Sequence, residues 1–330
     1  MTTFQAFRIH QAGRGVKAGF EQLTVDELTP GEVTIRVKWS GINYKDALAA
    51  TGKGKILRQY PLNGGIDLSG VVLASAAARF AAGDEVLVAG CGLSETADGG
   101  YSEVARVPAG CVVPLPAGLD LRAAMALGTA GFTAALAVAR MEQNGQTPAH
   151  GPVLVTGATG GVGAVAINIL TARGYEVAAF SGKPAQHGFL RDLGATQIVD
   201  RHAVEMGEKP LEKALWGGAV DNAGGNTLAW LTRTVKPWGN IASIGLVDDF
   251  RLHTTVMPFI LRGVSLLGIN SVELPAQLRD EIWTRLGADL KPPHLDRIVT
   301  RELAFDELAG AFEAYLEGSN TGRSVVKIQD

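Results

Sequence analysis

The segment PVLVTGATGGVGAVAINIL, residues 152–170, constrains the fold of this 330-residue chain more than any other. An apolar run leads into a glycine-rich turn, and an apolar helical stretch follows at once. A strand, a glycine turn and a helix in this order predict a dinucleotide-binding unit. In the pattern G-x-G-x-x-G, Gly160 and Gly163 hold the second and third positions, while Ala158 replaces the first glycine. The second glycine lets backbone approach a pyrophosphate, and the third lets the helix pack on the strand.

The rest of the chain decides whether the glycines belong to a dinucleotide-binding unit or only to a tight turn. Short glycine motifs often match by chance, so these glycines alone could mark nothing more than a tight turn. Here, however, helical stretches alternate with further compact apolar runs: EVAAFSG, TQIVD, GAVDNAG, NIASIGL and VSLLGIN. Such alternation is typical of a parallel sheet with crossover helices. We therefore expect Thr159 and the amides of Gly160, Gly161 and Val162 to contact the phosphates of a dinucleotide.

The length of the chain exceeds the size at which one hydrophobic core stops growing, so two domains are expected. Up to about residue 120, short alternating runs broken by glycine and proline predict a strand-rich, barrel-like unit. We assign residues 1–124 to this first domain and residues 125–264 to the dinucleotide-binding domain. Residues 265–330 are expected to pass through a strand at the sheet edge and return to complete the first domain. The predicted class is α/β.

Charge and cysteine content narrow the function further. The net charge of -3 gives no broad basic field to hold nucleic acid or an anionic membrane, so small-molecule partners are expected. Cys91 and Cys111 are too few for a disulfide framework, and we expect free thiols in a reducing compartment. The N-terminus lacks the apolar core of a signal peptide, and the longest apolar stretch, 126–139, is shorter than a membrane span. A cytoplasmic protein is predicted.

The end of the second predicted strand distinguishes NAD from NADP. An NAD site places Asp or Glu there, about 20 residues after the glycine turn, to bind the ribose hydroxyls. This chain has Ser181, Gly182 and Lys183 instead, so an ammonium group stands where a carboxylate would repel a 2′-phosphate. Arg201, just past the third strand, could close on the same phosphate. The alternative is that Lys183 and Arg201 are solvated surface charges. The sequence predicts NADPH as the cofactor.

From end to end, the chain resembles the medium-chain dehydrogenase/reductase superfamily, which implies a GroES-like catalytic domain and a Rossmann domain with the cofactor in the cleft between them. The resemblance rests on GINYKDAL, GGIDLSGVV, RFAAGDEVL, GGYSEVARVP, ALGTAGFTA, TGATGGVGAVA, GVSLLGINS and TGRSVVKI. Within the superfamily, NYKD, GTAGFTA, SGK, TTVMPFILRGV and GINS look like the zinc-free acrylyl-CoA reductase group, also labelled quinone oxidoreductases of the YhdH/YhfP type.

The residues at the zinc-ligand positions of the superfamily also agree with the zinc-free group. In its zinc alcohol dehydrogenases, the loop after a strand supplies a cysteine, and a later Gly-His-Glu supplies a histidine and a carboxylate. Here the loop reads Asn43-Tyr44-Lys45-Asp46, and the later motif reads Gly65-Ile66-Asp67. A catalytic zinc needs three protein ligands with an open fourth position. We therefore expect a metal-independent enzyme with no metal site.

The resemblance also assigns residues to the site. It places Tyr44 beside the nicotinamide, as a cofactor contact and as the proton donor or the group that orders the donor, with Asn43 as a second catalytic candidate. Tyr44 could instead only pack on the cofactor, and Asn43 could cap a helix through Asp46. The other residues that the resemblance puts near the cofactor are Leu246, Ile260, Ser271 and Arg323, with Arg323 pairing with a phosphate. Asn222 and Asn270 are weaker candidates that could be turn residues only.

The chemistry that fits this set is reduction of a carbon-carbon double bond conjugated to a carbonyl. Hydride adds to the β carbon, and charge spreads to an enolate oxygen that hydrogen-bond donors can stabilise without a metal. The prediction is NADPH-dependent reduction of acryloyl-CoA, or similar short 2-enoyl thioesters, to the saturated thioester. Two alternatives are an NADPH:quinone or general enone oxidoreductase, and an NADPH-binding protein with little catalysis. The apolar run GVSLLGIN at a sheet edge predicts a homodimer.

Overall fold

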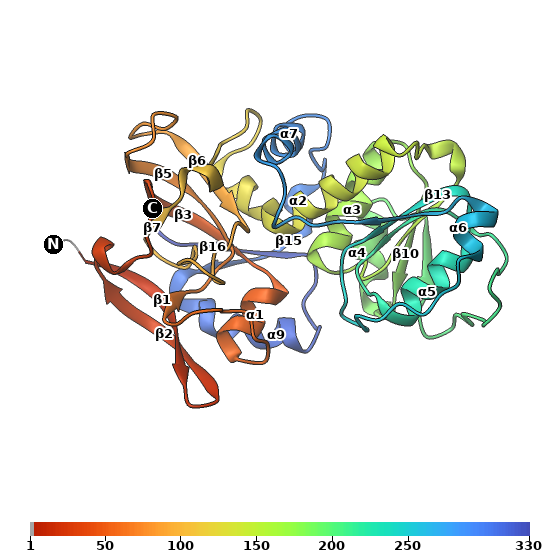
Figure 1. The fold of residues 1–330 in the computed structure, drawn as a ribbon, viewed down its shortest axis with the longest axis horizontal. Helices are drawn as coiled ribbons and strands as arrows, with labels where there is room; N and C mark the ends of the chain where they lie inside the picture. Colours follow the sequence, from red (N-terminus) through yellow and green to blue (C-terminus); the bar gives the residue numbers. More distant parts are fainter. Residues whose placement is uncertain (1–2) are drawn as a thin grey trace. The chain divides into compact units, whose positions relative to one another are not determined.

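The computed structural model describes residues 3–330, and the chain forms two compact units (Figure 1). The first unit contains the chain up to Thr129, then Val272–Asp289 and Val299–Asp330, and the second contains Ala130–Ser271 and Leu290–Ile298. The α/β class is confirmed. The structure differs from the predicted bounds in three places, because the first segment continues to Thr129, the second unit extends to Ser271, and residues 290–298 go back to the second unit. That excursion is too short to leave a periodic pattern in the sequence.

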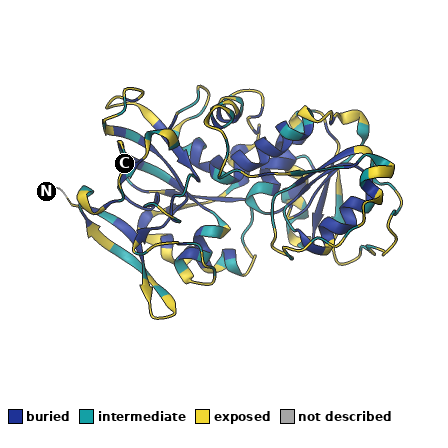
Figure 2. Cartoon of the chain, viewed as in Figure 1, coloured by how far each residue is buried: buried dark blue, intermediate teal, exposed yellow. Residues whose placement is uncertain are grey.

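The second unit is built on a parallel sheet in the order β11-β10-β9-β12-β13-β14. Strand order reverses between β9 and β12, the place where doubly wound sheets bind ligands. The central strands form the dark, buried interior of this unit in Figure 2. All the apolar runs predicted as strands are strands: β9 (Val153–Val155), β10 (Val177–Ser181), β11 (Gln197–Asp200), β12 (Trp216–Asp221), β13 (Val235–Ser243) and β14 (Ser265–Gly268).

The helices of the second unit follow these strands. They are α3 (Gly161–Ala172), α4 (His187–Asp192), α5 (Gly225–Thr234), α6 (Met257–Arg262) and α8 (Leu295–Ile298), with 3-10 turns η3 (Pro148–His150) and η4 (Pro184–Gln186). The segment 290–298 is attached to α3, since the Asn168 side-chain oxygen accepts the amide of His294 at 2.9 Å. This partly buried polar contact ties the excursion, which the sequence did not reveal, to the second unit.

The first unit contains a three-stranded sheet, β2-β1-β4, and a seven-stranded sheet ordered β15-β16-β3-β5-β6-β8, with β7 also paired to β3. In β3, Val33, Ile35 and Val37 are fully buried, while Arg36 between them is exposed, as the alternation in the sequence predicts. The strands are β1 (Phe4–Ala12), β2 (Gly15–Leu23), β3 (Val33–Ile42), β4 (Leu62–Asn63), β5 (Asp67–Ser75), β6 (Glu85–Ala89), β7 (Val104–Val107), β8 (Val113–Pro114), β15 (Val299–Ala304) and β16 (Arg323–Lys327).

Few helices accompany these sheets. They are α1 (Tyr44–Thr51), α7 (Ala276–Leu286) and α9 (Phe312–Leu316), with 3-10 turns η1 (Val25–Glu27), η2 (Ala109–Cys111) and η5 (Phe305–Ala311). The last strand, β16, pairs antiparallel with β3 and parallel with β15. The end of the chain is therefore built into the same sheet as the strand that leads to α1.

The chain passes from the first unit to the second within α2 (Leu121–Gln143). This helix is long and apolar enough to cross a membrane by length and composition, but 78% of its most apolar window is buried inside the protein, as in a core helix. It is interrupted at Gly128, whose φ of 50° and ψ of -155° are not helical. Only glycine adopts such a backbone without strain. The interruption leaves the last carbonyls of the first half without helical partners.

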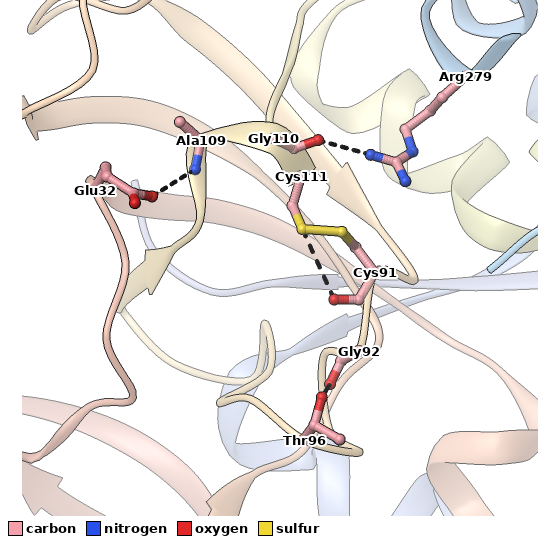
Figure 3. Close-up of a disulfide and its surroundings, with 8 residues drawn as sticks. All are labelled: Glu32, Cys91, Gly92, Thr96, Ala109, Gly110, Cys111 and Arg279. Carbon is pink, nitrogen blue, oxygen red and sulfur yellow. Dashed lines mark hydrogen bonds between the residues drawn. A yellow bond between two sulfur atoms is a disulfide. The ribbon is translucent and has the colours of Figure 1, made fainter. Parts of the chain in front are cut away.

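The prediction of free thiols is wrong, because Cys91 and Cys111 form a disulfide (Figure 3). Cys91 lies just after β6, and Cys111 ends η2. Their Cα atoms are 5.9 Å apart, within the usual range for a disulfide. Gly110, beside Cys111, accepts a hydrogen bond from the Arg279 guanidinium at 2.8 Å. Counting cysteines could not reveal this pair, since folding brings the two loops together.

Candidate active site

The glycine-rich turn joins β9 to α3 in the second unit. Gly160 is the N-cap of α3, and a side chain at Gly163 would collide with the main chain of Gly157 and Ala158. Gly163 therefore allows the helix to pack on the turn, as the motif predicts. The Gly160 amide differs from its predicted role, because it donates to the Gly157 carbonyl at 2.9 Å and closes the turn. The amides of Gly161 and Val162 belong to the first turn of α3, where main-chain amides have no helical acceptor.

The second strand end brings four predicted residues together. Ser181 ends β10 and is 6% exposed; its hydroxyl accepts the Lys183 amide at 3.1 Å, and its carbonyl accepts the Arg201 amide at 3.2 Å. The Arg201 side chain packs against Gly182. Burial and, after it, the Arg201 charge lower the pKa of the Lys183 amine. Two cations thus share one strand end, an arrangement that suits a phosphate.

Asn222, one of the weaker candidates, follows β12 next to the glycine turn. Its side-chain nitrogen donates to the Thr156 carbonyl at 2.8 Å, and its main-chain amide donates to the Thr156 hydroxyl at 2.8 Å. Its Oδ1 is buried and has no hydrogen-bond partner within residues 3–330. An unpaired buried acceptor is costly, so it points to a missing donor. A hydroxyl or amide group of a bound dinucleotide would supply one, and the residues around the glycine turn therefore fit such a cofactor.

The remaining second-unit candidates lie on loops and on α6. Thr159 lies within the glycine turn and is 7% exposed. Leu246 follows β13 and Ile260 lies in α6, and their side chains are 66% and 71% exposed. Ser271 follows β14, where its hydroxyl accepts a hydrogen bond from Thr133 at 2.9 Å. The structure thus leaves Leu246 and Ile260 open to a ligand, whereas Thr159 and Ser271 are anchored in the unit.

In the first unit, Tyr44 is the first residue of α1 and Asn43 is its N-cap. The main-chain amide of Asn43 donates to the Asp46 carboxylate at 2.8 Å. The helix is therefore capped by the side chain of Asp46 on the main chain of Asn43. Lys45 forms an ion pair with Glu95 rather than with Asp46. Tyr44 is 44% exposed, and among residues 3–330 its hydroxyl forms no hydrogen bond. That hydroxyl is available to a substrate.

The side chain of Asn43 points into a buried polar cluster rather than along the helix. Its Nδ2 donates to Asp67 Oδ2 at 2.7 Å and lies 3.2 Å from Asp46 Oδ2, and its Oδ1 accepts Arg323 Nη1 at 2.9 Å. Asp46 also accepts the Ile66 amide at 2.9 Å. Burial and, second, the Asp67 charge raise the pKa of Asp46 to about 7. Asp67 was missed by sequence reasoning, which considered its motif only as a site for metal ligands.

Arg323 lies within this cluster and is 2% exposed. Its guanidinium donates to the carbonyls of Ala126, Ile42 and Met125 at 3.0, 2.9 and 3.2 Å, besides Asn43. The guanidinium thus donates to groups inside the first unit, whereas the resemblance implied a pairing with a cofactor phosphate. The reason is the interruption of α2, which offers free carbonyls that a guanidinium can satisfy.

The residues at the predicted metal-ligand positions do not fit a catalytic zinc. The loop after β3 supplies an amide, a phenol and an amine in Asn43-Tyr44-Lys45, and the cysteines are bonded to each other. Within residues 3–330, no group of three or more His, Cys, Asp or Glu side chains is arranged to hold a metal ion. A tetrahedral site with three N, S or O ligands cannot be assembled from this set.

Two family models match the chain. The alcohol dehydrogenase GroES-like domain matches residues 29–117, and the zinc-binding dehydrogenase model matches residues 161–285. Among curated proteins, YhfP of Bacillus subtilis, which bears the name of a quinone oxidoreductase, is 46% identical over 99% of both chains. The acrylyl-CoA reductase AcuI of Ruegeria pomeroyi is 46% identical over 94% of both chains.

Solved structures give the same relationship. The crystal structure of the yhdH oxidoreductase from Salmonella enterica in complex with NADP has a TM-score of 0.95 and 45% identity, covering 98% of this chain and 100% of that one. The structure of Bacillus subtilis yhfP with NAD bound has a TM-score of 0.97 and 46% identity, covering 99% and 100%. The chain is therefore an oxidoreductase of the medium-chain dehydrogenase/reductase superfamily and belongs to its zinc-free group of acrylyl-CoA reductases and YhfP-type proteins.

Proposed function

We propose that this protein is an NADPH-dependent reductase of short 2-enoyl-CoA thioesters, with acryloyl-CoA as its first substrate and propionyl-CoA as the product. The observation that carries the proposal is the near full-length similarity to an acrylyl-CoA reductase. The cation pair at the end of β10 supports NADPH rather than NADH as the reductant, because Lys183 follows the strand end that lacks the acid for ribose hydroxyls and Arg201 lies beside it. The bound NAD of the YhfP structure makes that preference worth testing.

The residues of the second unit bind the cofactor. The helical amides of Gly161 and Val162 hold the pyrophosphate, Lys183 and Arg201 hold the 2′-phosphate, and Asn222 Oδ1 accepts a donor from the dinucleotide. When bound, NADPH supplies the hydride that adds to the β carbon of the thioester. The protein itself positions the substrate and supplies the proton. Positioning alone accounts for much of the acceleration in such reactions.

Tyr44 is the proposed source of the proton. After hydride addition the extra electron pair resides in the enolate, so a proton must reach the α carbon while the carbonyl re-forms. One NADPH and one proton are consumed for each thioester reduced. Tyr44 is the first residue of α1 and is 44% exposed, so a substrate can reach its side chain. It donates this proton directly or orders the water that does.

The second candidate function is reduction of a quinone or a simple enone. The name of YhfP favours it, and its identity to this chain equals that of AcuI. The two functions share cofactor and fold and differ only in the acceptor. A thioester brings phosphates and an adenine that a quinone lacks, so the ratio of their specificity constants separates the two.

The test is the initial rate of NADPH oxidation by purified protein with acryloyl-CoA and, in parallel, with 1,4-benzoquinone. A far higher kcat/KM for acryloyl-CoA supports the thioester reductase. A higher kcat/KM for the quinone supports the second candidate function. If neither substrate is turned over, both candidate functions are wrong. Repeating each assay with NADH measures the cofactor preference in the same experiment.

We also propose that the protein is a homodimer. The strand β14 ends the sheet order, so one side of its backbone has no strand partner among the described residues. Large apolar side chains are exposed on the same unit, and an interface between two copies would remove apolar surface from water. They are Trp238, Leu246, Val247, Phe250, Val256, Ile260 and Leu261, each at least 60% exposed.

A further inference from the structure

The side chain of Asn43 is fixed at both ends by buried charged groups. Its nitrogen donates to Asp67 at 2.7 Å, while its oxygen accepts the Arg323 guanidinium at 2.9 Å. Hydrogen bonds to ionised partners are roughly twice as strong as neutral ones. Rotating the amide by half a turn would place its nitrogen against the guanidinium and its oxygen against the carboxylate. The cluster therefore allows one orientation of Asn43.

Asp67 is itself held rigidly. It is fully buried, and the amide of Thr129 donates to both of its carboxylate oxygens at 3.0 Å, while the Thr129 hydroxyl donates at 2.5 Å. Those donors are available because Gly128 interrupts α2 directly before Thr129. A Cβ at Gly128 would lie 2.5 Å from Asp67 Oδ2, so the close approach requires glycine. The carboxylate thus occupies the start of the second half of α2, where negative charge is favoured.

The position of Tyr44 depends on this arrangement. Asn43 is the residue at which the chain leaves β3 and enters α1, and Tyr44 is the next residue. Because the Tyr44 hydroxyl has no hydrogen bond within residues 3–330, the only restraints on its direction are the backbone at Asn43 and packing. A displacement of about 1 Å in a reacting group can lower a rate by roughly 100-fold. The hydrogen bonds that fix Asn43 should therefore affect the rate at which the substrate is protonated.

We propose that Asp67 is a positioning residue, which acts through Asn43 to hold Tyr44 in the direction needed for protonation of the substrate. The inference rests on the proposed function of Tyr44 as proton source. Asp67 does not touch the substrate, and its role is to keep the Asn43 side chain, and with it the first turn of α1, in one conformation.

The kinetic test is a double-mutant cycle with Asp67→Asn and Tyr44→Phe. The asparagine has the shape of the aspartate, but it carries no charge and replaces one of the two acceptor oxygens with a donor. Asp67→Asn should lower kcat by about 10- to 100-fold and leave the KM for NADPH within about twofold. In the Tyr44→Phe background the same substitution should lower kcat by less than about twofold, because the group that it positions is already gone. An equal loss in both backgrounds overturns the proposal, as does an unchanged kcat of Asp67→Asn alone.

A second readout is independent of turnover. With 3-fluorotyrosine incorporated only at position 44, the ¹⁹F resonance should shift or split in Asp67→Asn. The matched control carries the label at Tyr175 of the second unit, whose resonance should stay in place. An unchanged Tyr44 resonance contradicts positioning. If acryloyl-CoA is not turned over, the proposed function fails, while this spectrum still decides whether Asp67 controls Tyr44.

A separate variant covers the case in which Asp67→Asn does not fold. Asn43→Ala removes the link between the two residues and leaves Asp67 with its hydrogen bonds to Thr129. It should reproduce the loss of kcat and the ¹⁹F shift, whereas wild-type kcat and an unmoved resonance overturn the proposal. Far-ultraviolet circular dichroism of each variant confirms that the fold is retained.

Discussion

The main-chain amide of Arg201 donates to the carbonyl of Ser181, 3.2 Å away, and this bond ties together the ends of the neighbouring parallel strands β10 and β11. It places the Arg201 side chain over Gly182 and next to Lys183. Both cations therefore serve one location at the carboxyl end of the sheet, where dinucleotides bind in this architecture.

Replacing Lys183 with Asp should raise the KM for NADPH by at least about 10-fold, which corresponds to about 1.4 kcal/mol, and should change the KM for NADH much less. The reason is that the substitution removes an attraction for the 2′-phosphate and adds a repulsion. Steady-state kinetics with both cofactors give the ratio. Lys209→Asp, at an exposed position of the same unit, is the charge-matched control. A ratio equal to that of the wild type would exclude Lys183 from the phosphate site.

Replacing Tyr44 with Phe should separate proton donation from packing. If the hydroxyl supplies the proton, kcat falls by about 100-fold or more at unchanged affinity for NADPH, since general acids contribute at least that much. If the ring only packs on the cofactor, the phenylalanine keeps kcat. Titration of NADPH fluorescence gives the affinity, and a stopped-flow measurement gives the rate. Weaker NADPH binding with normal turnover would assign Tyr44 to packing.

The sequence predicted the second unit well and the polar cluster of the first unit poorly. The strands β9 to β14 are recognisable because each is a compact apolar run, and their order follows from alternation with helices. The cluster around Asn43 depends on contacts between distant segments. Asp67 and Thr129 are 62 residues apart in the chain, and Asn43 and Arg323 are 280 apart. No local pattern encodes such a pairing.

Local patterns also leave the partners of some residues open. Asp46 accepts the main-chain amides of Asn43 and Ile66, while Lys45 reaches Glu95 on another loop. The Gly160 amide closes its own turn, because the turn bends more tightly than the motif alone specifies. In each case the residue type was informative, and the partner was decided by tertiary packing.

The disulfide between Cys91 and Cys111 should contribute to stability under oxidising conditions. Closing a loop over a sequence separation of 20 residues removes conformational entropy from the unfolded chain, worth about 3 kcal/mol in the loop-entropy model. Thermal unfolding should therefore occur at a lower temperature after reduction with dithiothreitol. The variant Cys91→Ser/Cys111→Ser is the control, and its unfolding temperature should not respond to the reductant. Equal unfolding temperatures of the oxidised and reduced wild type would show that the bond adds nothing.

The buried carboxyl of Asp46 should make stability fall as the pH rises. Its pKa is about 7 in the folded protein, against the usual 3.8, because of burial and then the Asp67 charge. The unfolded chain therefore loses this proton first, and the free energy of unfolding decreases between pH values of about 4 and about 7. The Asp46→Asn variant has no carboxyl at this position, so its free energy of unfolding should lack this part of the pH dependence. Scanning calorimetry from about pH 5 to about pH 8 compares the two slopes, and parallel curves would mean that Asp46 keeps an ordinary pKa.

Pairing of β14 with a second copy should set the oligomeric state. An apolar edge strand beside exposed hydrophobic side chains is unstable in water as a monomer surface, so a two-fold partner that covers both is favoured. Light scattering should give a mass near twice the 34.5 kDa of one chain. Leu261→Glu, at a position that is 60% exposed, places a charge in the covered patch without disturbing the core, and it should shift the protein toward the monomer. Lys209→Gln, at an exposed position, also lowers the net charge by one and is the matched control. A monomeric wild type at micromolar concentration would show that the edge strand is left open and that the exposed side chains serve another ligand.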